Sequence, residues 1–382
     1  MQAGRLAKAV KKALPHSKAI IGGVHASVLP ERTLREFTAF DYAVIGEGDI
    51  TIVELVHFLE SHSSESFPFE IPGVAFLDGD SRYVQNKPRD IIRDLDSLPP
   101  PAWDMFRPAK EYIIHTQKGC PYHCPFCTNP NGTTIRAESA ERVIQQFSEL
   151  HEKYGCQSIG IGDEVFTLNK KRTIQICQQL RDTGLAAKVK WNCSTHINSM
   201  DDDIAQAVVY GGCSLVGLGI ESGDLERLNS IGKGTTVEKI FSTVDTLKRN
   251  KVPFAAYCIL GQPDETAQSA RQLVDFAVKI NPTAPVFGIM VPYPGTEIGR
   301  MAEAGLGGYK LIAKDWNDYN KQIGNAVEFD GVQRKTLERI QLFGYLKVYL
   351  YNWRIRDLLR MSWQYSSLIF SLLKKSFKRG SA

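Results

Sequence analysis

Three cysteines stand close together in the first half of the chain. Cys120, Cys124 and Cys127 have the spacing C-x3-C-x2-C within residues 118–127. Thiols packed into one short loop do not pair as ordinary disulfides, because a disulfide requires a defined separation of its two Cα atoms. Thiolates are ligands for zinc and for iron–sulfur clusters. The spacing predicts one metal centre: either a zinc site with His123 or a distant cysteine as fourth ligand, or a cubane cluster with one open iron.

The elements around this loop alternate between strands and helices. After residue 110, apolar runs predict strands at 111–116, 158–162, 188–194, 215–220, 254–260 and 286–290, with helices between them and Ser139 as one N-cap. Repeated β–α units build a parallel sheet, so we expect a partial (β/α)6 TIM-like barrel. Chemistry in such barrels lies at the carboxyl ends of the strands, which is where the cysteine loop falls.

Other polar segments also follow these strands. Asp163 and Glu164 follow the second strand, Glu221 and Ser222 the fourth, and Gly261 the fifth. With Phe126 directly before the last cysteine, and with the segments "GLGIESGD" and "LGQPDE" downstream, the chain resembles the radical S-adenosylmethionine superfamily. The resemblance implies a 4Fe-4S cluster on the three cysteines. Its open iron would bind the amino and carboxylate groups of S-adenosylmethionine, whose reductive cleavage yields a 5′-deoxyadenosyl radical.

The resemblance also implies roles for single residues. It places Phe126, Asp163 and Glu164 at the cofactor, with an acidic side chain accepting from the methionine amino group. Glu221 would accept from the ribose hydroxyls and Ser222 would lie near the methionine carboxylate, while Gly261 would let the backbone approach adenine. Capping of a helix is an equally good interpretation of Asp163. Where relatives often have an arginine after the third strand, this chain has His196, a weaker partner for a carboxylate.

The first 95 residues predict a smaller α/β domain. Strands are expected at 18–25 and 41–45 and helices at 5–14 and 50–59, followed by a hairpin at 71–93 with an Asp-Gly turn at 78–79. The segments "IGGVHASVLPE" and "DYAVIGEGD" resemble the second half of a cobalamin-binding domain, in which Gly22 and Gly23 would approach the nucleotide tail. The Asp-x-His-x-x-Gly loop of that family's first half does not occur. We therefore expect a truncated Rossmann-like domain, with cobalamin binding doubtful, and either a fragment of a longer protein or a lost cobalamin function.

Composition sets the remaining expectations. The chain has 382 residues, of which 43% are hydrophobic and 23% charged, and eight cysteines that do not form a disulfide framework. These values favour a globular cytoplasmic protein. We divide it into a cobalamin-binding-like domain (1–95), a proline-rich linker (96–110), a barrel (111–310) and a helical basic C-terminal region (311–382). The last 52 residues contain eleven Lys and Arg against two Asp and Glu, and 368–379 is amphipathic and basic.

The sequence favours an enzyme over a binding protein. The leading hypothesis is radical generation for cobalamin-dependent methyl transfer to an unactivated carbon. Oxidative cyclisation of a tetrapyrrole-like or lipid-like substrate is the alternative within the class, and a non-catalytic iron–sulfur redox sensor is the alternative outside it. Expected partners are a small-molecule substrate, with a hydrophobic one as an option, and an electron donor such as flavodoxin or ferredoxin. The basic tail is interpreted first as the solvated face of a helix that covers the barrel, and second as a contact for an anionic membrane surface. Nucleic acid is not expected, and no residue identifies the substrate or a catalytic side chain.

Overall fold

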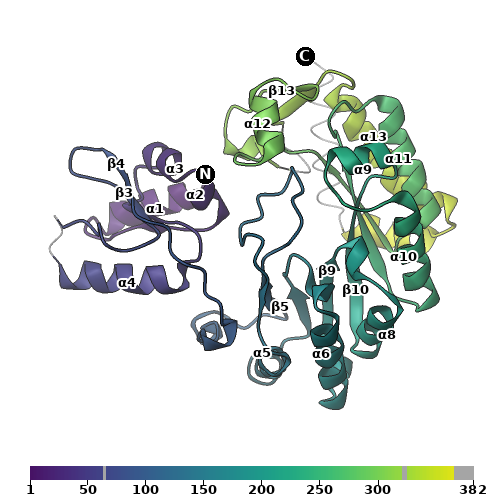
Figure 1. Cartoon of the computed structure of the whole chain (residues 1–382), viewed down its shortest axis with the longest axis horizontal. Coiled ribbons are helices and arrows are strands. Elements are labelled where there is room, and N and C mark those ends of the chain that lie inside the picture. The colour runs from purple at the N-terminus through teal and green to yellow at the C-terminus, as the bar shows by residue number, and fades with distance from the viewer. Residues whose placement is uncertain (63–65, 321–324, 365–382) are drawn as a thin grey trace.

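A small N-terminal domain lies beside a larger barrel domain (Figure 1). The computed structural model describes residues 1–62, 66–320 and 325–364, without the side chains of 361–364. The connection between the domains contains two short 3-10 helices, Leu95–Ser97 and Trp103–Met105. The predicted amphipathic tail at 368–379 lies outside the described residues.

The N-terminal domain is a four-stranded sheet in the order β1-β2-β3-β4 with helices packed on it. Its strands are β1 (Ile20–Ile21), β2 (Tyr42–Val44), β3 (Val74–Leu77) and β4 (Tyr83–Gln85), and its helices are α1 (Gln2–Ala13), α2 (Val24–Val28), α3 (Pro30–Glu36) and α4 (Gly48–Ser61). β1 and β2 are parallel, as a Rossmann-like domain requires, whereas β3 and β4 are antiparallel. The sheet is therefore mixed, because the predicted hairpin joins it.

The turn of that hairpin differs from the prediction. Five residues, 78–82, connect β3 to β4 instead of a two-residue Asp-Gly turn. The Asp78 N–H donates to the Arg82 carbonyl at 3.0 Å, and the Asp78 carboxylate accepts from the N–H groups of Asp80 and Arg82 at 3.0 and 2.9 Å. Hydrogen bonds from the aspartate side chain thus hold a wider loop.

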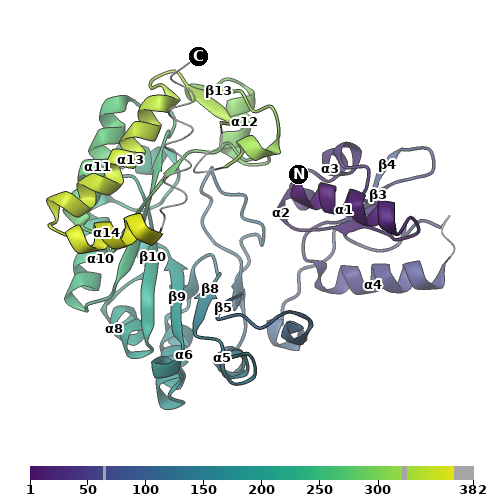
Figure 2. The same ribbon diagram turned by 180° about the vertical axis from the view of Figure 1, so that it is seen from behind.

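Six parallel strands form the barrel domain, in the order β12-β11-β10-β9-β8-β5. The strands are β5 (Glu111–Ile114), β8 (Ser158–Ile161), β9 (Lys190–Thr195), β10 (Cys213–Glu221), β11 (Phe254–Leu260) and β12 (Ala284–Ile289). The helices are α5 (Ala140–Tyr154), α6 (Lys170–Asp182), α7 (Leu185–Lys188), α8 (Asp202–Tyr210), α9 (Leu225–Ser230), α10 (Val237–Arg249), α11 (Ala267–Ile280) and α12 (Glu297–Glu303). The sheet order follows the chain order, and helices cover the outer face of a curved, open sheet (Figures 1 and 2). The expected partial barrel is confirmed.

Local signals place these helices where the sequence predicts them. The Ser139 hydroxyl caps α5 by accepting from the Arg142 N–H at 3.1 Å, as expected. Val143, Phe147 and Leu150 on that helix are fully buried in the main core. Replacing such a cap costs about 1 kcal/mol, so the helix depends mainly on this burial.

The C-terminal region covers one edge of the sheet. It contains β13 (Tyr309–Leu311) and β14 (Val327–Phe329), which pair in antiparallel fashion, a 3-10 turn (Trp316–Asp318), and the expected helices α13 (Arg334–Tyr351) and α14 (Ile355–Gln364). On α13, the Gln341 side chain donates to the Phe287 carbonyl at 2.6 Å, and the Tyr345 hydroxyl accepts from the Phe287 N–H at 3.1 Å. The backbone of edge strand β12 is thereby partnered by side chains.

No helix within the described ranges is both long and apolar enough to cross a membrane.

Candidate active site

The cysteine loop is a long excursion closed at its base by a short ladder. β6 (Gln117–Lys118) pairs antiparallel with β7 (Arg136–Ala137), and the loop lies between them. Gly119 begins the loop at φ +98°, and a Cβ there would lie 2.3 Å from the Thr134 carbonyl oxygen. No other residue fits this position without a shift of the backbone, because the clash is with main-chain atoms and the conformation is left-handed.

Hydrogen bonds within the loop hold the backbone of all three cysteines. The Cys120 N–H donates to the Gly132 carbonyl at 3.0 Å, and the Cys127 N–H donates to the Cys124 carbonyl at 2.9 Å. Asn129 bridges the loop, because its side chain donates to the Cys120 carbonyl at 3.1 Å and its N–H contacts Cys127 Sγ at 3.3 Å. Hydrogen bonds within the chain thus fix the backbone of the loop around the cysteines.

The three thiols match the donor set of an iron–sulfur cluster. All eight cysteines of the chain are free, and only these three are at least partly exposed. Burial raises the pKa of the Cys120 thiol and raises that of Cys124 to about 11, so both would lose a proton on binding metal. Among the described residues no group of three His, Cys, Asp or Glu is already arranged to hold a metal ion. The loop therefore supplies the ligands without presenting a closed ligand set.

Asp163 anchors the start of the loop. Its carboxylate is buried and accepts from the Thr116 N–H and hydroxyl, both at 2.6 Å, and from the Gln117 N–H at 3.0 Å. Burial raises the pKa of Asp163, and these hydrogen bonds oppose the rise. Because both carboxylate oxygens are occupied, the structure favours a positioning role between β8 and β5 over contact with a ligand.

Glu164 reaches the cysteine loop itself. Its Oε1 accepts from the Asn131 side chain at 2.5 Å, and Glu164 remains partly exposed. Among the described residues its second oxygen accepts no hydrogen bond, so a carboxylate beside the loop is available to an amine. Phe126, by contrast, packs against the main hydrophobic core and holds the loop to the barrel.

Glu221 ends β10 in an unusual conformation. Its φ of +60° lies in the left-handed region, and the pairing register with β11 shifts between Gly219 and Glu221. Such a conformation costs about 1–3 kcal/mol for a residue other than glycine and is found mainly at functional sites. The turn directs a buried carboxylate to Lys233, whose Nζ lies 3.0 Å from Glu221 Oε1. The neighbouring Ser222 is also buried, and its hydroxyl accepts from the Asp224 N–H at 3.1 Å.

Lys233 is a buried cation whose charge acts on the thiols of Cys120 and Cys124. It is 5% exposed, and although burial lowers its pKa, the charges of Glu221 and Cys124 raise it further, so the net shift is upward. The turn that carries it contacts the cysteine loop, since a Cβ at Gly232 would lie 3.5 Å from the His123 carbonyl oxygen. An ammonium thus lies between a carboxylate and the thiols. The sequence alone does not indicate Lys233 as a site residue, because a lysine before a helix has no distinctive pattern.

His196 holds this turn against the cysteine loop. Its ring stacks on Tyr122 with centroids 3.7 Å apart and planes at 17°. Its Nδ1 accepts from the Asn198 N–H at 3.2 Å, which leaves Nε2 to donate to the Lys233 carbonyl at 3.1 Å. Burial and the Lys233 charge lower the pKa of His196 to about 4, so the ring is neutral at physiological pH. The residue that replaces the expected arginine therefore joins the loop to the lysine turn.

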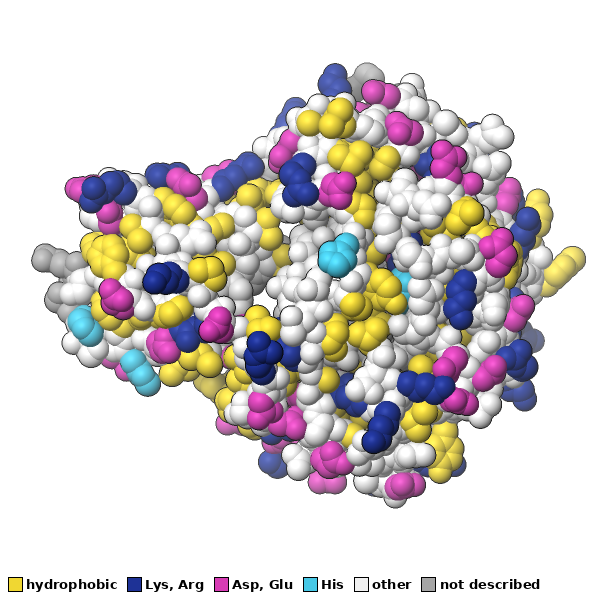
Figure 3. Space-filling model, viewed as in Figure 1, with side chains coloured by type: hydrophobic (Ala, Val, Ile, Leu, Met, Phe, Trp, Pro, Cys, Tyr) yellow, Lys and Arg dark blue, Asp and Glu magenta, His cyan; other side chains and the backbone are white. Residues whose placement is uncertain are grey.

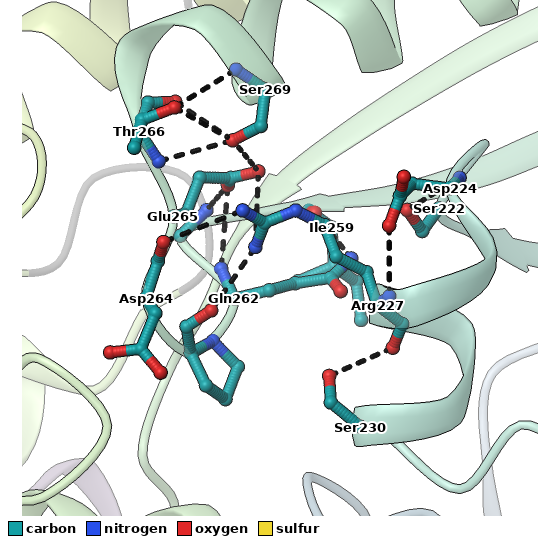
Figure 4. A network of polar contacts seen from close by, with 12 residues as sticks. Ser222, Asp224, Arg227, Ser230, Ile259, Gln262, Asp264, Glu265, Thr266 and Ser269 are labelled. Atoms are coloured by element: carbon teal, nitrogen blue, oxygen red, sulfur yellow. Dashed lines mark hydrogen bonds and ion pairs between the residues drawn. The ribbon is translucent and has the colours of Figure 1, made fainter.

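The turn after β11 is rigid. At Gly261, φ is +76° and a Cβ would lie 2.6 Å from the Phe329 ring. The Gly261 N–H donates to Glu265, and its carbonyl accepts from the Tyr309 hydroxyl at 3.0 Å. Figure 4 shows Arg227 of α9 reaching this turn, where its Nη1 donates to the Pro263 carbonyl at 3.1 Å. The predicted contact of Gly261 with adenine remains a prediction, and both backbone polar groups of that residue already have partners.

The N-terminal domain presents two open glycines at the ends of its parallel strands. Gly23 follows β1 at φ +90° and Gly46 follows β2 at φ +74°, and a Cβ at either would meet no atom within 4 Å. A Cβ at Gly22, in contrast, would lie 3.7 Å from the Val44 carbonyl oxygen. The Ser27 hydroxyl accepts from the Gly46 N–H at 2.9 Å and joins the two turns. Open glycines at adjacent strand ends form a cradle that a flat or extended ligand can approach.

The centre of the face in Figure 3 is mostly yellow and white with some histidine, whereas lysine, arginine, aspartate and glutamate side chains surround this centre on the N-terminal domain and on the rest of the barrel. In the same view, Figure 1 places the cysteine loop at this centre. An apolar centre favours organic ligands over highly charged ones.

A partial barrel of six parallel strands with a three-cysteine loop at the carboxyl ends of its strands is typical of an enzyme of the radical S-adenosylmethionine type. The family model of the Radical SAM superfamily matches residues 114–277, and that of the B12 binding domain matches residues 2–56. The chain belongs to the Radical SAM superfamily and carries a B12 binding domain. The family's 4Fe-4S cluster, S-adenosylmethionine and cobalamin are the cofactors of such a chain.

Several known proteins resemble this chain over most of its length. An uncharacterised methyltransferase of Pyrococcus horikoshii is 32% identical over 90% of this chain and 75% of its own. The anaerobic magnesium-protoporphyrin IX monomethyl ester cyclase of Cereibacter sphaeroides is 27% identical over 76% of this chain, which spans 49% of the cyclase. The structure of the radical S-adenosylmethionine methyltransferase TsrM from Kitasatospora setae has a TM-score of 0.67 at 19% identity, covering 84% of this chain and 65% of that one, and shows the shared fold.

Proposed function

We propose that this protein uses a cluster on Cys120, Cys124 and Cys127 to cleave S-adenosylmethionine and transfers a methyl group to an unactivated carbon with the help of cobalamin. The observation that carries the proposal is the pairing, in one chain, of the cysteine loop with a B12 binding domain whose strand ends are open at Gly23 and Gly46. The name of the Pyrococcus horikoshii relative, a methyltransferase, supports methyl transfer.

The proposed binding site for S-adenosylmethionine lies between the cysteine loop and β10. When bound, the cluster supplies the electron for cleavage and the corrinoid carries the methyl group. Glu164 is oriented to accept from the methionine amino group, since it already accepts from an amide beside the loop. Glu221 is suited to the ribose hydroxyls because its buried carboxylate lies at the carboxyl end of β10 and can accept twice.

Lys233 takes the role of binding the methionine carboxylate of S-adenosylmethionine, for which His196 is unsuited. A methionine carboxylate requires a cation, and the neutral His196 ring cannot provide one. The Lys233 ammonium is buried, its charge lowers the pKa of the Cys124 thiol against the effect of burial, and among the described residues it donates to Glu221 at 3.0 Å. We therefore assign the carboxylate of S-adenosylmethionine to Lys233, with Ser222 in the adjoining turn. Three further residues shape the protein side of the proposed site: Asp163, Phe126 and Gly261.

Cobalamin is assigned to the glycine cradle of the N-terminal domain. Gly22 and Gly23 end β1, and the missing side chain at Gly23 leaves space beside Gly46. A bulky side chain at either open glycine would project into that space. The residues present thus fit a corrinoid approaching the carboxyl ends of β1 and β2.

Oxidative cyclisation is the second candidate. The similarity to the magnesium-protoporphyrin cyclase favours it, and the apolar centre of the face in Figure 3 suits a tetrapyrrole-like or lipid-like substrate in either reaction. We further propose a cytoplasmic location, a flavodoxin or ferredoxin as electron donor, and contact of the basic tail with anionic membrane.

The products distinguish the two reactions. Reductive cleavage of S-adenosylmethionine yields methionine and, after hydrogen abstraction, 5′-deoxyadenosine, whereas donation of its methyl group leaves S-adenosylhomocysteine. The anaerobically reconstituted protein should form both with dithionite and cobalamin. Formation of 5′-deoxyadenosine without cobalamin-dependent S-adenosylhomocysteine would favour the cyclase.

A matched pair of variants controls for folding. Cys120→Ser should abolish 5′-deoxyadenosine formation, while Cys156→Ser, which alters a fully buried thiol outside the loop, should retain it. Absence of product from an iron-loaded wild-type protein would exclude the enzyme and leave a redox sensor.

A further inference from the structure

A buried ion pair joins the N-terminal domain to the cysteine loop. Arg136 Nη1 on β7 donates to Glu47 Oε1, and the two side chains are only 3% and 11% exposed. The segment that connects the two domains also contacts this ion pair, through the backbone of Ile92. Arg136 Nη1 donates to the Ile92 carbonyl at 2.9 Å, and the Ile92 N–H donates to Glu47 Oε2 at 3.1 Å. Three separate segments thus meet at one charged pair.

The N-terminal end of this contact belongs to the glycine cradle. Glu47 lies between Gly46 and Gly48, in the turn that ends β2 and begins α4. Gly46 is one of the two open glycines, and Ser27 holds its N–H. A ligand that fills the cradle therefore meets the residue directly before Glu47.

The other end belongs to the cysteine loop. Arg136 pairs with Lys118 in the ladder that closes the loop, next to Gly119 and Cys120. Its Nη2 also donates to the Asn131 carbonyl at 3.4 Å, and Asn131 donates to Glu164. One guanidinium thus contacts the base of the loop and the residue that holds Glu164.

We infer that Glu47 and Arg136 are positioning residues that couple the glycine cradle to the cysteine loop, so that each cofactor alters the affinity for the other. This inference rests on the proposed function. A buried ion pair resists separation, because each charge would be left without solvent or partner. A shift of the turn at Gly46 is therefore passed to β7. Coupling between two binding sites is reciprocal, which makes it measurable from either side.

The experiment compares hydroxocobalamin affinities by anaerobic equilibrium dialysis, with and without the reconstituted cluster. The wild-type dissociation constants should differ by at least about fivefold, the lower range of allosteric coupling. Glu47→Gln and Arg136→Gln should each still bind cobalamin but bring the ratio close to one. Electron paramagnetic resonance of the reduced cluster should change on addition of cobalamin in the wild type and not in these variants.

Asp49→Asn is the matched control. It removes the exposed contact of Asp49 with Lys118, at 3.1 Å, which links the same two parts of the molecule and has side chains 40% and 22% exposed. The ratio should stay at the wild-type value. A wild-type ratio near one, an unchanged ratio in a folded Glu47 or Arg136 variant, or an equal loss in Asp49→Asn would each overturn the inference. Failure of every form to bind cobalamin would instead overturn the proposed cobalamin function, and the coupling with it.

Discussion

At the scale of single residues, the candidate site depends on contacts between side chains that are far from each other in the sequence or lack a motif. The cysteines and Glu221 could be predicted because their spacing and strand-end position resemble a family. Lys233 and Asn131 could not, because their roles follow from a turn and a loop that meet only in the folded chain. For Asp163, whose expected role at the cofactor stays a prediction, the structure adds three hydrogen bonds from the start of the loop that no sequence pattern shows.

Lys233→Gln tests the assigned carboxylate site. Hydrogen bonds to charged groups contribute about 1.5–3 kcal/mol, so loss of the ammonium should weaken S-adenosylmethionine binding by about tenfold or more. Isothermal titration of the cluster-loaded protein measures this. Lys118→Gln is the control: it changes a lysine that pairs with Asp49 at 3.1 Å, and this variant should bind S-adenosylmethionine normally. Equal affinity of Lys233→Gln and wild type would remove Lys233 from the site.

His196 predicts a specific dependence of stability on pH. Its pKa is lowered from 6.5 to about 4 in the folded protein, chiefly by burial. Between these values the unfolded chain binds a proton that the folded chain does not, so stability from this residue is present above pH 6.5 and is lost as the pH falls toward 4. Melting temperatures of His196→Gln and wild type should therefore converge from pH 7 to pH 5. A constant difference would show that the ring is not held neutral.

At the scale of elements, periodicity predicted the barrel well because each strand and helix carries its own pattern of buried residues. It missed β6–β7 and β13–β14, whose strands of two or three residues are too short to show alternation. The mixed N-terminal sheet was also only partly foreseen, because a sequence pattern predicts a hairpin without showing which strand it joins.

Gly119→Ala tests the base of the cysteine loop. The added Cβ would clash with the Thr134 carbonyl and strain the backbone by about 1–3 kcal/mol. Iron incorporation on reconstitution should fall, with a lower melting temperature. Gly79→Ala is the control, because a Cβ there meets no atom within 4 Å. Full iron loading of Gly119→Ala would show that the ladder does not shape the metal site.

At the scale of the whole molecule, the sequence could indicate two domains and their cofactors but not how the domains meet. Glu47 and Arg136 are 89 positions apart, and the indole N–H of Trp316 donates to Glu36 at 2.6 Å across 280 positions. Neither pair belongs to a local pattern, since charged residues on strand and helix ends are common. These contacts hold the N-terminal domain against the rest of the chain.

The central claim is that Cys120, Cys124 and Cys127 hold a 4Fe-4S cluster whose open iron binds S-adenosylmethionine. Electron paramagnetic resonance of the anaerobically reconstituted, dithionite-reduced protein tests this most directly. The wild type should contain about four irons per chain and show a cluster spectrum that changes when S-adenosylmethionine is added, while the protein with all three cysteines replaced by alanine should show neither. Iron retained by that variant, a single bound zinc, or a spectrum indifferent to S-adenosylmethionine would contradict the account.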